Sequence, residues 1–110
     1  MWMNELTQKR CKPCEGGIPA LSPAQTQALL KQTKNWELRE NKISKDFSFS
    51  NFVQAMAFVN KVAEIAEQEG HHPDLHIHYN RVRCVLWTHA VSGLTENDFI
   101  LAAKIDASNA

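Results

Sequence analysis

Alternating apolar and polar residues predict two antiparallel hairpins. Residues 36–38 and 43–49 alternate with a period of two, which is typical of half-buried strands. Glu40 and Asn41 between them can form a turn. A second pair of such stretches covers residues 75–79 and 82–89. The pattern therefore indicates four short strands, paired as two hairpins.

Capping residues predict a helix before the first hairpin and another after the second. Ser22, Pro23 and Gln25 form a helix start, with serine as N-cap, proline in the first turn and glutamine three residues after the cap. This helix is expected over residues 23–34. The last helix opens with a second capping box, from Thr95 to Asp98, and is expected to continue to about residue 105.

A long helix with an unusually wide apolar surface is expected over residues 51–68. Ser50 is expected to cap its start, and Gly70 to end it, with Pro73 just beyond. Such a helix is expected to bury one face on its own sheet and another on something else, such as a second subunit. The stripe comprises Phe52, Ala55, Met56, Val59, Val62, Ala63 and Ala66, and is widened by Val53, Phe58 and Ile65.

The order of these elements is helix, two strands, helix, two strands, helix. Antiparallel hairpins joined through a long helix predict an α+β fold with the helices on one face of the sheet. Residues 1–21, which contain a proline- and glycine-rich stretch, are expected to form an irregular N-terminal leader. Residues 22–110 are expected to form a single domain.

Composition restricts the possible functions. A chain of 110 residues has room for one core. With 12 basic and 12 acidic residues it has no net charge to attract nucleic acid or anionic lipid. No apolar run is long enough to span a membrane, and the first residues do not resemble a secretory signal, so we expect a cytoplasmic protein. Three cysteines, an odd number, argue against a disulfide-bonded scaffold.

All five histidines lie between positions 71 and 89, around the second hairpin. If Asn80 and Arg81 form its turn, His89 lies opposite His72 and therefore beside the His71–His72 pair. In this register one face of the hairpin is apolar, with Tyr79 facing Val82, Ile77 facing Cys84 and Leu75 facing Leu86. The other face carries His76, His78, Arg83, Val85 and Trp87.

His71 and His72 follow a predicted helix C-terminus, where the helix dipole favours a protonated imidazole. Glu67, four residues before His71, is expected to orient it. Neighbouring histidines can act as general acid and general base, so the sequence predicts proton-transfer chemistry here. The alternative is that these are polar residues of a loop and a strand edge.

A metal site is a weaker hypothesis. His76 and His78 share one strand face and His72 or His89 could add a ligand, but Asp74 is the only carboxylate with an obvious ligand role. Cys11 and Cys14 have the spacing of half a zinc site, but a reduced pair in the leader is the favoured alternative. Asp98 is explained as a capping residue, and Trp36 and Trp87 as packing residues.

Seven spaced positions resemble the signature of the pterin-4a-carbinolamine dehydratases. They are Glu67-x3-His71-His72-Pro73-x5-Tyr79-x9-His89-x8-Asp98. The resemblance extends over roughly residues 20–106 and includes Gly-Leu-Thr-x-x-Asp at 93–98. It implies a four-stranded antiparallel sheet with three helices on one face.

The resemblance also implies an activity, the conversion of 4a-hydroxytetrahydrobiopterin to quinonoid dihydropterin and water. This reaction recycles the cofactor of aromatic amino acid hydroxylases, so functional coupling to phenylalanine hydroxylase is implied. The implied catalytic residues are His71, His72 and His89, and the residues that bind or orient the substrate are Glu67, Pro73, Asp74 and Tyr79. The resemblance implies no cofactor and no metal. It implies a homo-oligomer, either a dimer or a tetramer. Some members have an acidic residue where this chain has Gly70, so Glu67 or Asp74 is expected to carry more of the orienting role.

Within this resemblance we expect His71 to be the acid at the 4a-hydroxyl and His89 the base at N5, with His72 positioning the pterin. Animal family members also act as dimerisation partners of a transcription factor, so a non-catalytic regulatory module is the alternative. A small metal-binding regulator built on His76, His78 and the leader cysteines is a third hypothesis.

Overall fold

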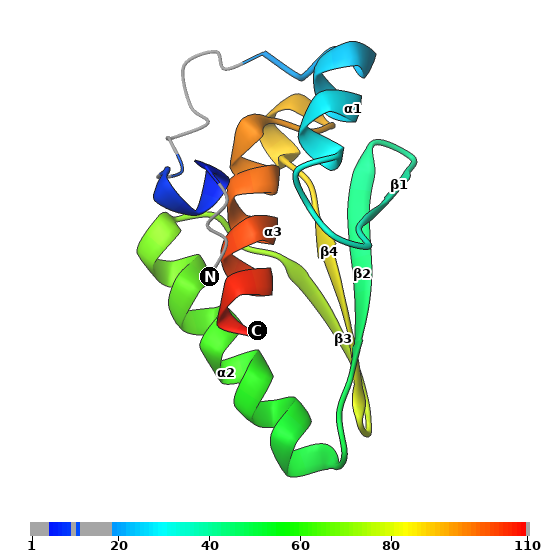
Figure 1. Ribbon diagram of the computed structural model, residues 1–110, viewed down its shortest axis with the longest axis vertical. Helices are drawn as coiled ribbons and strands as arrows, with labels where there is room; N and C mark the ends of the chain where they lie inside the picture. Colours follow the sequence, from blue (N-terminus) through cyan, green and yellow to red (C-terminus); the bar gives the residue numbers. More distant parts are fainter. Residues whose placement is uncertain (1–4, 10, 12–18, 110) are drawn as a thin grey trace.

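The computed structural model describes residues 5–9, 11 and 19–109. Its elements are η1 (Glu5–Gln8), α1 (Pro23–Leu30), β1 (Glu37–Arg39), β2 (Lys42–Ser48), α2 (Phe52–Glu69), β3 (Asp74–His78), β4 (Arg81–Leu86), η2 (His89–Val91) and α3 (Glu96–Ser108). The strands form one antiparallel sheet in the order β1-β2-β4-β3, and the α-helices lie on one side of it (Figure 1). The predicted α+β fold is therefore confirmed.

The first hairpin forms as predicted. Glu40 and Asn41 connect β1 to β2, and both have positive φ angles, 52° and 61°. Two consecutive left-handed residues give the turn whose twist matches that of paired strands. Arg39 therefore pairs with Lys42.

The second hairpin has a different turn from the one predicted. Tyr79 and Asn80 form it, with Tyr79 at φ 54°, so that His78 pairs with Arg81 and Leu75 with Cys84. The backbone and side chain of Asn80 both bond to Phe49, which fixes the turn against the end of β2. The register is thus displaced by two residues, and a displacement of two leaves the side chains of β3 and β4 on their predicted faces.

Helix α2 begins and ends one residue later than predicted, at Phe52 and Glu69. Asn51, not Ser50, is the N-cap, and its side-chain oxygen accepts the Gln54 N–H at 2.9 Å. Gly70 ends the helix in the left-handed conformation, at φ 66°, where glycine has no Cβ to strain.

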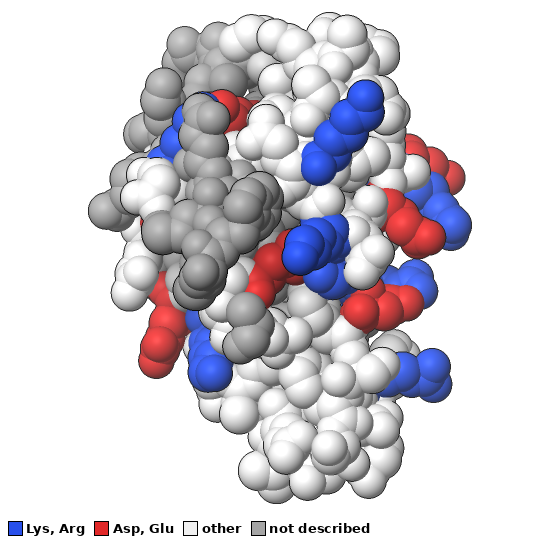
Figure 2. All heavy atoms as spheres, viewed as in Figure 1, with Lys and Arg blue, Asp and Glu red and all other residues white. Residues whose placement is uncertain are grey.

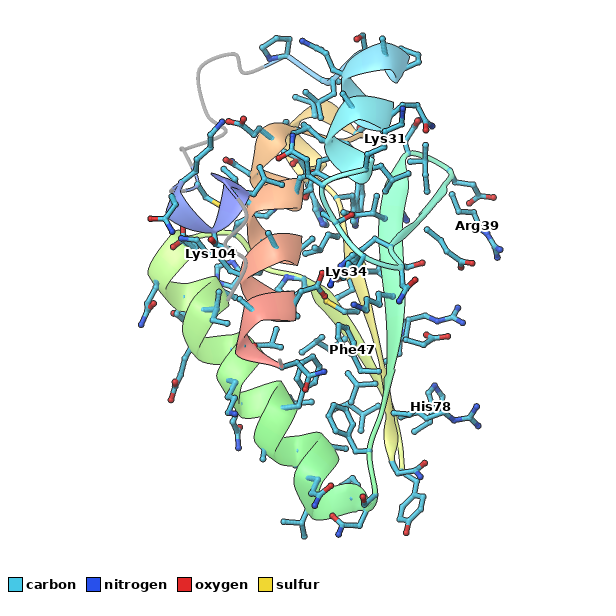
Figure 3. The ribbon with its side chains drawn as sticks, in the orientation of Figure 1. Lys31, Lys34, Arg39, Phe47, His78 and Lys104 are labelled. Carbon is cyan, nitrogen blue, oxygen red and sulfur yellow. The ribbon has the colours of Figure 1, made fainter. Side chains whose placement is uncertain are left out.

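The core lies between the sheet and the helices. Phe47 projects from β2 toward the helices and packs on Trp36 and Phe58, at ring-centroid distances of 6.2 and 4.6 Å (Figure 3). Helix α3 is buried along most of its length and is the central helix of the layer. The inward side chains of the sheet and of α3 include Ile43, Val82, Cys84, Leu86, Phe99, Leu101 and Ile105.

Part of the predicted leader belongs to this core. The η1 turn contacts α3, and Leu6 is 1% exposed within the main apolar cluster. Cys11 packs against the same cluster. Among the described residues, no helix combines the length and apolar character needed to cross a membrane.

Candidate active site

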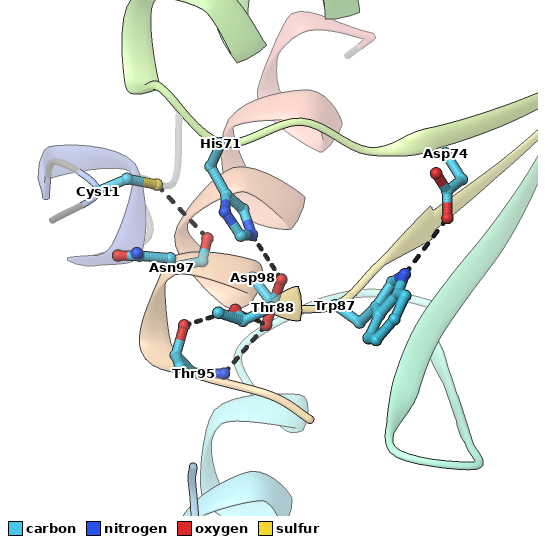
Figure 4. A network of polar contacts seen from close by, with 8 residues as sticks. All are labelled: Cys11, His71, Asp74, Trp87, Thr88, Thr95, Asn97 and Asp98. Atoms are coloured by element: carbon cyan, nitrogen blue, oxygen red, sulfur yellow. Dashed lines mark hydrogen bonds and ion pairs between the residues drawn. The ribbon is translucent and has the colours of Figure 1, made fainter. Parts of the chain in front are cut away.

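The turn that ends α2 directs the side chain of His71 into the interior of the molecule. The residue is 8% exposed, and its Nε2 lies 2.6 Å from Oδ1 of Asp98 on α3 (Figure 4). This contact joins the end of α2 to the start of α3, although 27 residues separate the partners in sequence.

Asp98 is fully buried and holds several donors at once. Its Oδ2 accepts the Thr88 hydroxyl at 2.8 Å and the Thr95 N–H at 3.0 Å, while Oδ1 faces His71. The hydroxyls of Thr88 and Thr95 also bond to each other, at 2.9 Å. A buried carboxylate is stabilised by such donors. Asp98 is thus both the expected capping residue and the partner of His71, a role that capping alone did not reveal.

Glu67 contacts His72 and not His71, which corrects the sequence-based expectation. Glu67 Oε2 lies 2.6 Å from His72 Nε2, and the two side chains are 77% and 61% exposed. The left-handed Gly70 turns the chain so that consecutive histidines diverge, His71 toward α3 and His72 toward solvent. The histidine pair therefore has two carboxylate partners in two environments, one buried and one exposed.

His89 lies beyond the end of β4, at the start of η2. Its ring stacks on Trp87, with centroids 3.8 Å apart and planes 27° from parallel. The Trp87 Nε1–H bonds to Asp74 Oδ2 at 3.3 Å, and the ammonium of Lys42 lies 4.5 Å from the indole centroid. Trp87 is therefore a contact residue of the site rather than only a packing residue.

Apart from the Glu67–His72 contact, the predicted residues are connected through neighbouring residues rather than directly. His89 and Trp87 flank Thr88, whose hydroxyl contacts Asp98. His72 and Asp74 flank Pro73, and Asp74 contacts Trp87. Strand pairing ends at Asp74 with Val85, so the predicted opposition of His72 and His89 does not form.

Tyr79 is not brought to this site within one chain. It lies in the β3–β4 turn, 65% exposed, and the whole of β3 separates it from His72. His76 and His78 lie along the same strand. Over the described residues, no group of three or more histidine, cysteine, aspartate or glutamate side chains is arranged to hold a metal ion.

The described cysteines are poorly suited to nucleophilic chemistry. Burial, with smaller contributions from nearby carboxylates, raises the pKa of Cys11 and of Cys84 to about 12. Cys11 also donates its N–H to Glu69 at 2.8 Å, and its Sγ lies 3.5 Å from the Asn97 carbonyl oxygen. Cys14, the other half of the predicted cysteine pair, lies outside the described residues.

The α+β fold thus carries, at one end of its sheet, two histidines that each contact a carboxylate. Residues 19–108 match the family described as pterin 4 alpha carbinolamine dehydratase. The chain belongs to this family, as its motif indicated. A protein of Nitrosomonas eutropha named "Putative pterin-4-alpha-carbinolamine dehydratase" is 52% identical over 103 residues, covering 93% of this chain and 91% of that protein.

Two solved structures share the fold. A protein of Brucella melitensis described as a transcriptional coactivator/pterin dehydratase superposes with a TM-score of 0.77 at 32% identity, covering 80% of this chain and 96% of that one. A pterin dehydratase-like protein described as a RuBisCO assembly factor in the alpha-carboxysome gives a TM-score of 0.56 at 26% identity, covering 66% and 83%. One of these two structures is thus described as a coactivator and dehydratase, and the other by an assembly role.

Proposed function

We propose that this protein dehydrates 4a-hydroxytetrahydropterins, with 4a-hydroxytetrahydrobiopterin as the representative substrate. In this reaction the 4a-hydroxyl accepts a proton and leaves as water, while N5 loses its proton and the C4a=N5 double bond forms. The chemistry needs an acid and a base and no electron transfer. The observation that carries the proposal is the His71–Asp98 contact, a buried imidazole–carboxylate pair beside further histidines.

The acid role is assigned to His71, with a different partner from the one expected. Asp98 takes the place of Glu67 as the carboxylate that orients the ring. His89, exposed and stacked on Trp87, is the candidate base at N5. His72, exposed and held by Glu67, would position the pterin together with Pro73 and Asp74, whereas Tyr79 would reach a site only from another subunit.

The test is a dehydration assay on freshly generated carbinolamine, followed by absorbance with and without protein. His71→Ala and His89→Ala should each lower kcat by roughly 10²–10⁴-fold, the range typical of general acid–base groups. The uncatalysed dehydration is subtracted as background. Arg39→Ala, which removes an exposed charge on β1, is the matched control and should retain the wild-type rate. Wild-type protein that does not exceed the background would refute the proposal.

Catalysis is proposed to require neither metal nor cofactor. The same assay is therefore run on protein treated with EDTA, which should keep its full rate. Activity lost with EDTA and restored by zinc would contradict this part of the proposal and return attention to the histidines of β3. The remaining parts of the proposal are a cytoplasmic location, a homo-oligomer and coupling to an aromatic amino acid hydroxylase such as phenylalanine hydroxylase.

A non-catalytic binding module is the second candidate. The structural relative described as an assembly factor supports it, as do apolar side chains left exposed at the start of α2, where Val53 is 76% exposed. The two candidates differ in one measurement. A binding module would leave the carbinolamine dehydration rate at its background value, with wild-type and His71→Ala proteins indistinguishable.

A further inference from the structure

The sheet face opposite the helices is open and carries a cluster of basic side chains. The helices pack against the side formed by Val82, Cys84 and Leu86, so the alternate residues Arg81 and Arg83 project from the open side. Figure 3 shows His78 and Arg39 on this open side, away from the helices. Figure 2 shows further charged side chains along the right-hand, sheet side of the molecule.

Strand register places the basic residues in two adjacent rows. In one row Asp46 of β2 pairs with Arg83 of β4, and Arg83 with His76 of β3. In the next row Ser48 pairs with Arg81, and Arg81 with His78. The first row contains a counter-charge, the carboxylate of Asp46, and the second row contains none. Opposite charges on neighbouring strands stabilise a sheet, so Arg81 lacks a stabilising contact that Arg83 has.

The two arginines therefore have different surroundings. Arg83 donates to both carboxylate oxygens of Asp46, at 2.8 and 3.2 Å, and this contact, with a smaller effect of Arg81, holds the pKa of Asp46 below its ordinary value. Within the described part of the chain, Arg81 has no ion-pair partner. Its guanidinium is available to an external anion.

A shallow cavity of about 460 Å³ joins these side chains. It is lined by Asp46, His76, His78, Arg81 and Arg83, which carry one negative and two positive charges even with both histidines neutral. A neighbouring cavity of about 450 Å³ is lined by four basic and three acidic residues, so it has the same excess of one positive charge. The cavity beside Arg81 differs from it by its two histidines, which can add hydrogen-bond donors.

We propose that this cavity is a binding site for a phosphate group. A planar guanidinium presents paired N–H donors that match phosphate oxygens, and imidazole N–H groups can donate further hydrogen bonds to the same phosphate. Arg81 would make the principal contact, with His76 and His78 beside it. The phosphate would be carried either by the side chain of the pterin or by a separate small molecule, since the open face continues from His76 to Asp74 and Trp87 of the candidate active site.

The first experiment does not depend on enzymatic activity. Inorganic phosphate is titrated into the full-length ¹⁵N-labelled protein, and amide chemical shifts are followed. Saturable shifts are expected at residues 76–83, lost in Arg81→Ala and in the more conservative Arg81→Gln, and retained in Arg39→Ala. The absence of saturable shifts in the wild type would overturn the proposal, as would unchanged shifts in both folded Arg81 variants.

The second experiment identifies the source of the phosphate and rests on the proposed function. Carbinolamines with and without a phosphate ester on the pterin side chain are compared in the dehydration assay. A KM about tenfold lower for the phosphorylated substrate, abolished by Arg81→Ala, would assign the phosphate to the substrate. Equal KM values alongside phosphate binding by NMR would assign it to a separate molecule. A chain with no dehydratase activity would refute the proposed function and leave the NMR result to decide the phosphate site.

Discussion

At the scale of single residues, Asp98 combines two tasks that are usually separate. It caps α3 through the Thr95 N–H, and it holds the imidazole of His71. The sequence predicted the first task, because a capping box is local and can be recognised over four residues. The second depends on a contact between residues 27 positions apart, which no local pattern encodes. The family motif contains both residues, but Asp98 was predicted only as a capping residue.

Replacing Asp98 by Asn should therefore affect stability and catalysis together. The amide keeps the size of the carboxylate but loses its charge. Its NH₂ group cannot accept the hydrogen bonds that the replaced carboxylate oxygen accepts. We expect a loss of about 3 kcal/mol in the free energy of unfolding and a fall in kcat of about 10²-fold or more. Chemical denaturation and the dehydration assay measure the two effects.

Glu67→Gln is the matched control for stability, because the Glu67–His72 pair is mostly exposed. Exposed ion pairs contribute little, so its unfolding free energy should stay within about 1 kcal/mol of wild type. An Asp98→Asn protein with wild-type stability and rate would show that the buried contact serves neither purpose.

Asp46 gives the molecule a defined response to acid. The hydrogen bond from Arg83 lowers the pKa of this carboxyl from its ordinary value of 3.8, so folding favours the ionised form. The contribution to stability is therefore present above pH 4 or so and is lost as the pH falls through the lower, folded-state pKa. The effect is limited, since both side chains are more than half exposed.

The corresponding variant is Asp46→Asn. Its unfolding free energy should lie below that of wild type at pH 6. The unfolding free energies of the two proteins should converge as the pH falls below 4. High salt should reduce the difference at pH 6, because an exposed pair is screened. A difference that grows toward low pH would have the opposite sign and would contradict the assigned cause.

At the scale of elements, what could be predicted depended on how distinctive each local signal was. The wide apolar stripe of α2 and the left-handed Gly70 gave its extent to within a residue, whereas Ser50 and Asn51 are both good N-caps and the choice between them was wrong. The β3–β4 turn contains no glycine, and a register displaced by two residues preserves the apolar face. The contacts of Asn80 with Phe49, which fix that turn, come from a different hairpin.

Gly70 ends α2 and sets the direction in which the chain continues to His71 and His72. Its substitution tests how much the left-handed conformation contributes to stability. An added Cβ would meet no atom within 4 Å, so the cost of Gly70→Ala is the backbone strain of φ 66° alone. We expect a loss of about 1 kcal/mol of unfolding free energy. Gly70→Asn should lose less, because asparagine tolerates the left-handed region better than alanine. Equal stability of all three proteins, measured by thermal unfolding, would contradict this account.

At the scale of the whole molecule, the uncharged end of the protein is the expected contact with another copy. In Figure 2 the charged side chains lie around the middle of the visible face, and the lower end, formed by the start of α2 and the β3–β4 turn in Figure 1, lacks them. Phe52, Val53 and Tyr79 are 48%, 76% and 65% exposed there. The wide apolar stripe of α2 also predicted a contact with another copy through residues such as Phe58, Val62 or Ile65. Phe58 and Val62 are buried in the core of this chain, and Ile65 is partly buried against it.

Val53→Glu is therefore the variant that tests self-association. The wild type should sediment as a dimer or tetramer at micromolar concentration, since an exposed apolar patch is stabilised by burial in an interface. Val53→Glu should shift it toward the monomer, with the circular dichroism spectrum unchanged, because Val53 makes little contribution to the core. Phe58→Glu should instead unfold the chain, and Lys34→Glu, an exposed change remote from this end, should leave the assembly intact. A wild type that sediments as a stable monomer would exclude the homo-oligomer, and with it the only route by which Tyr79 could reach an active site.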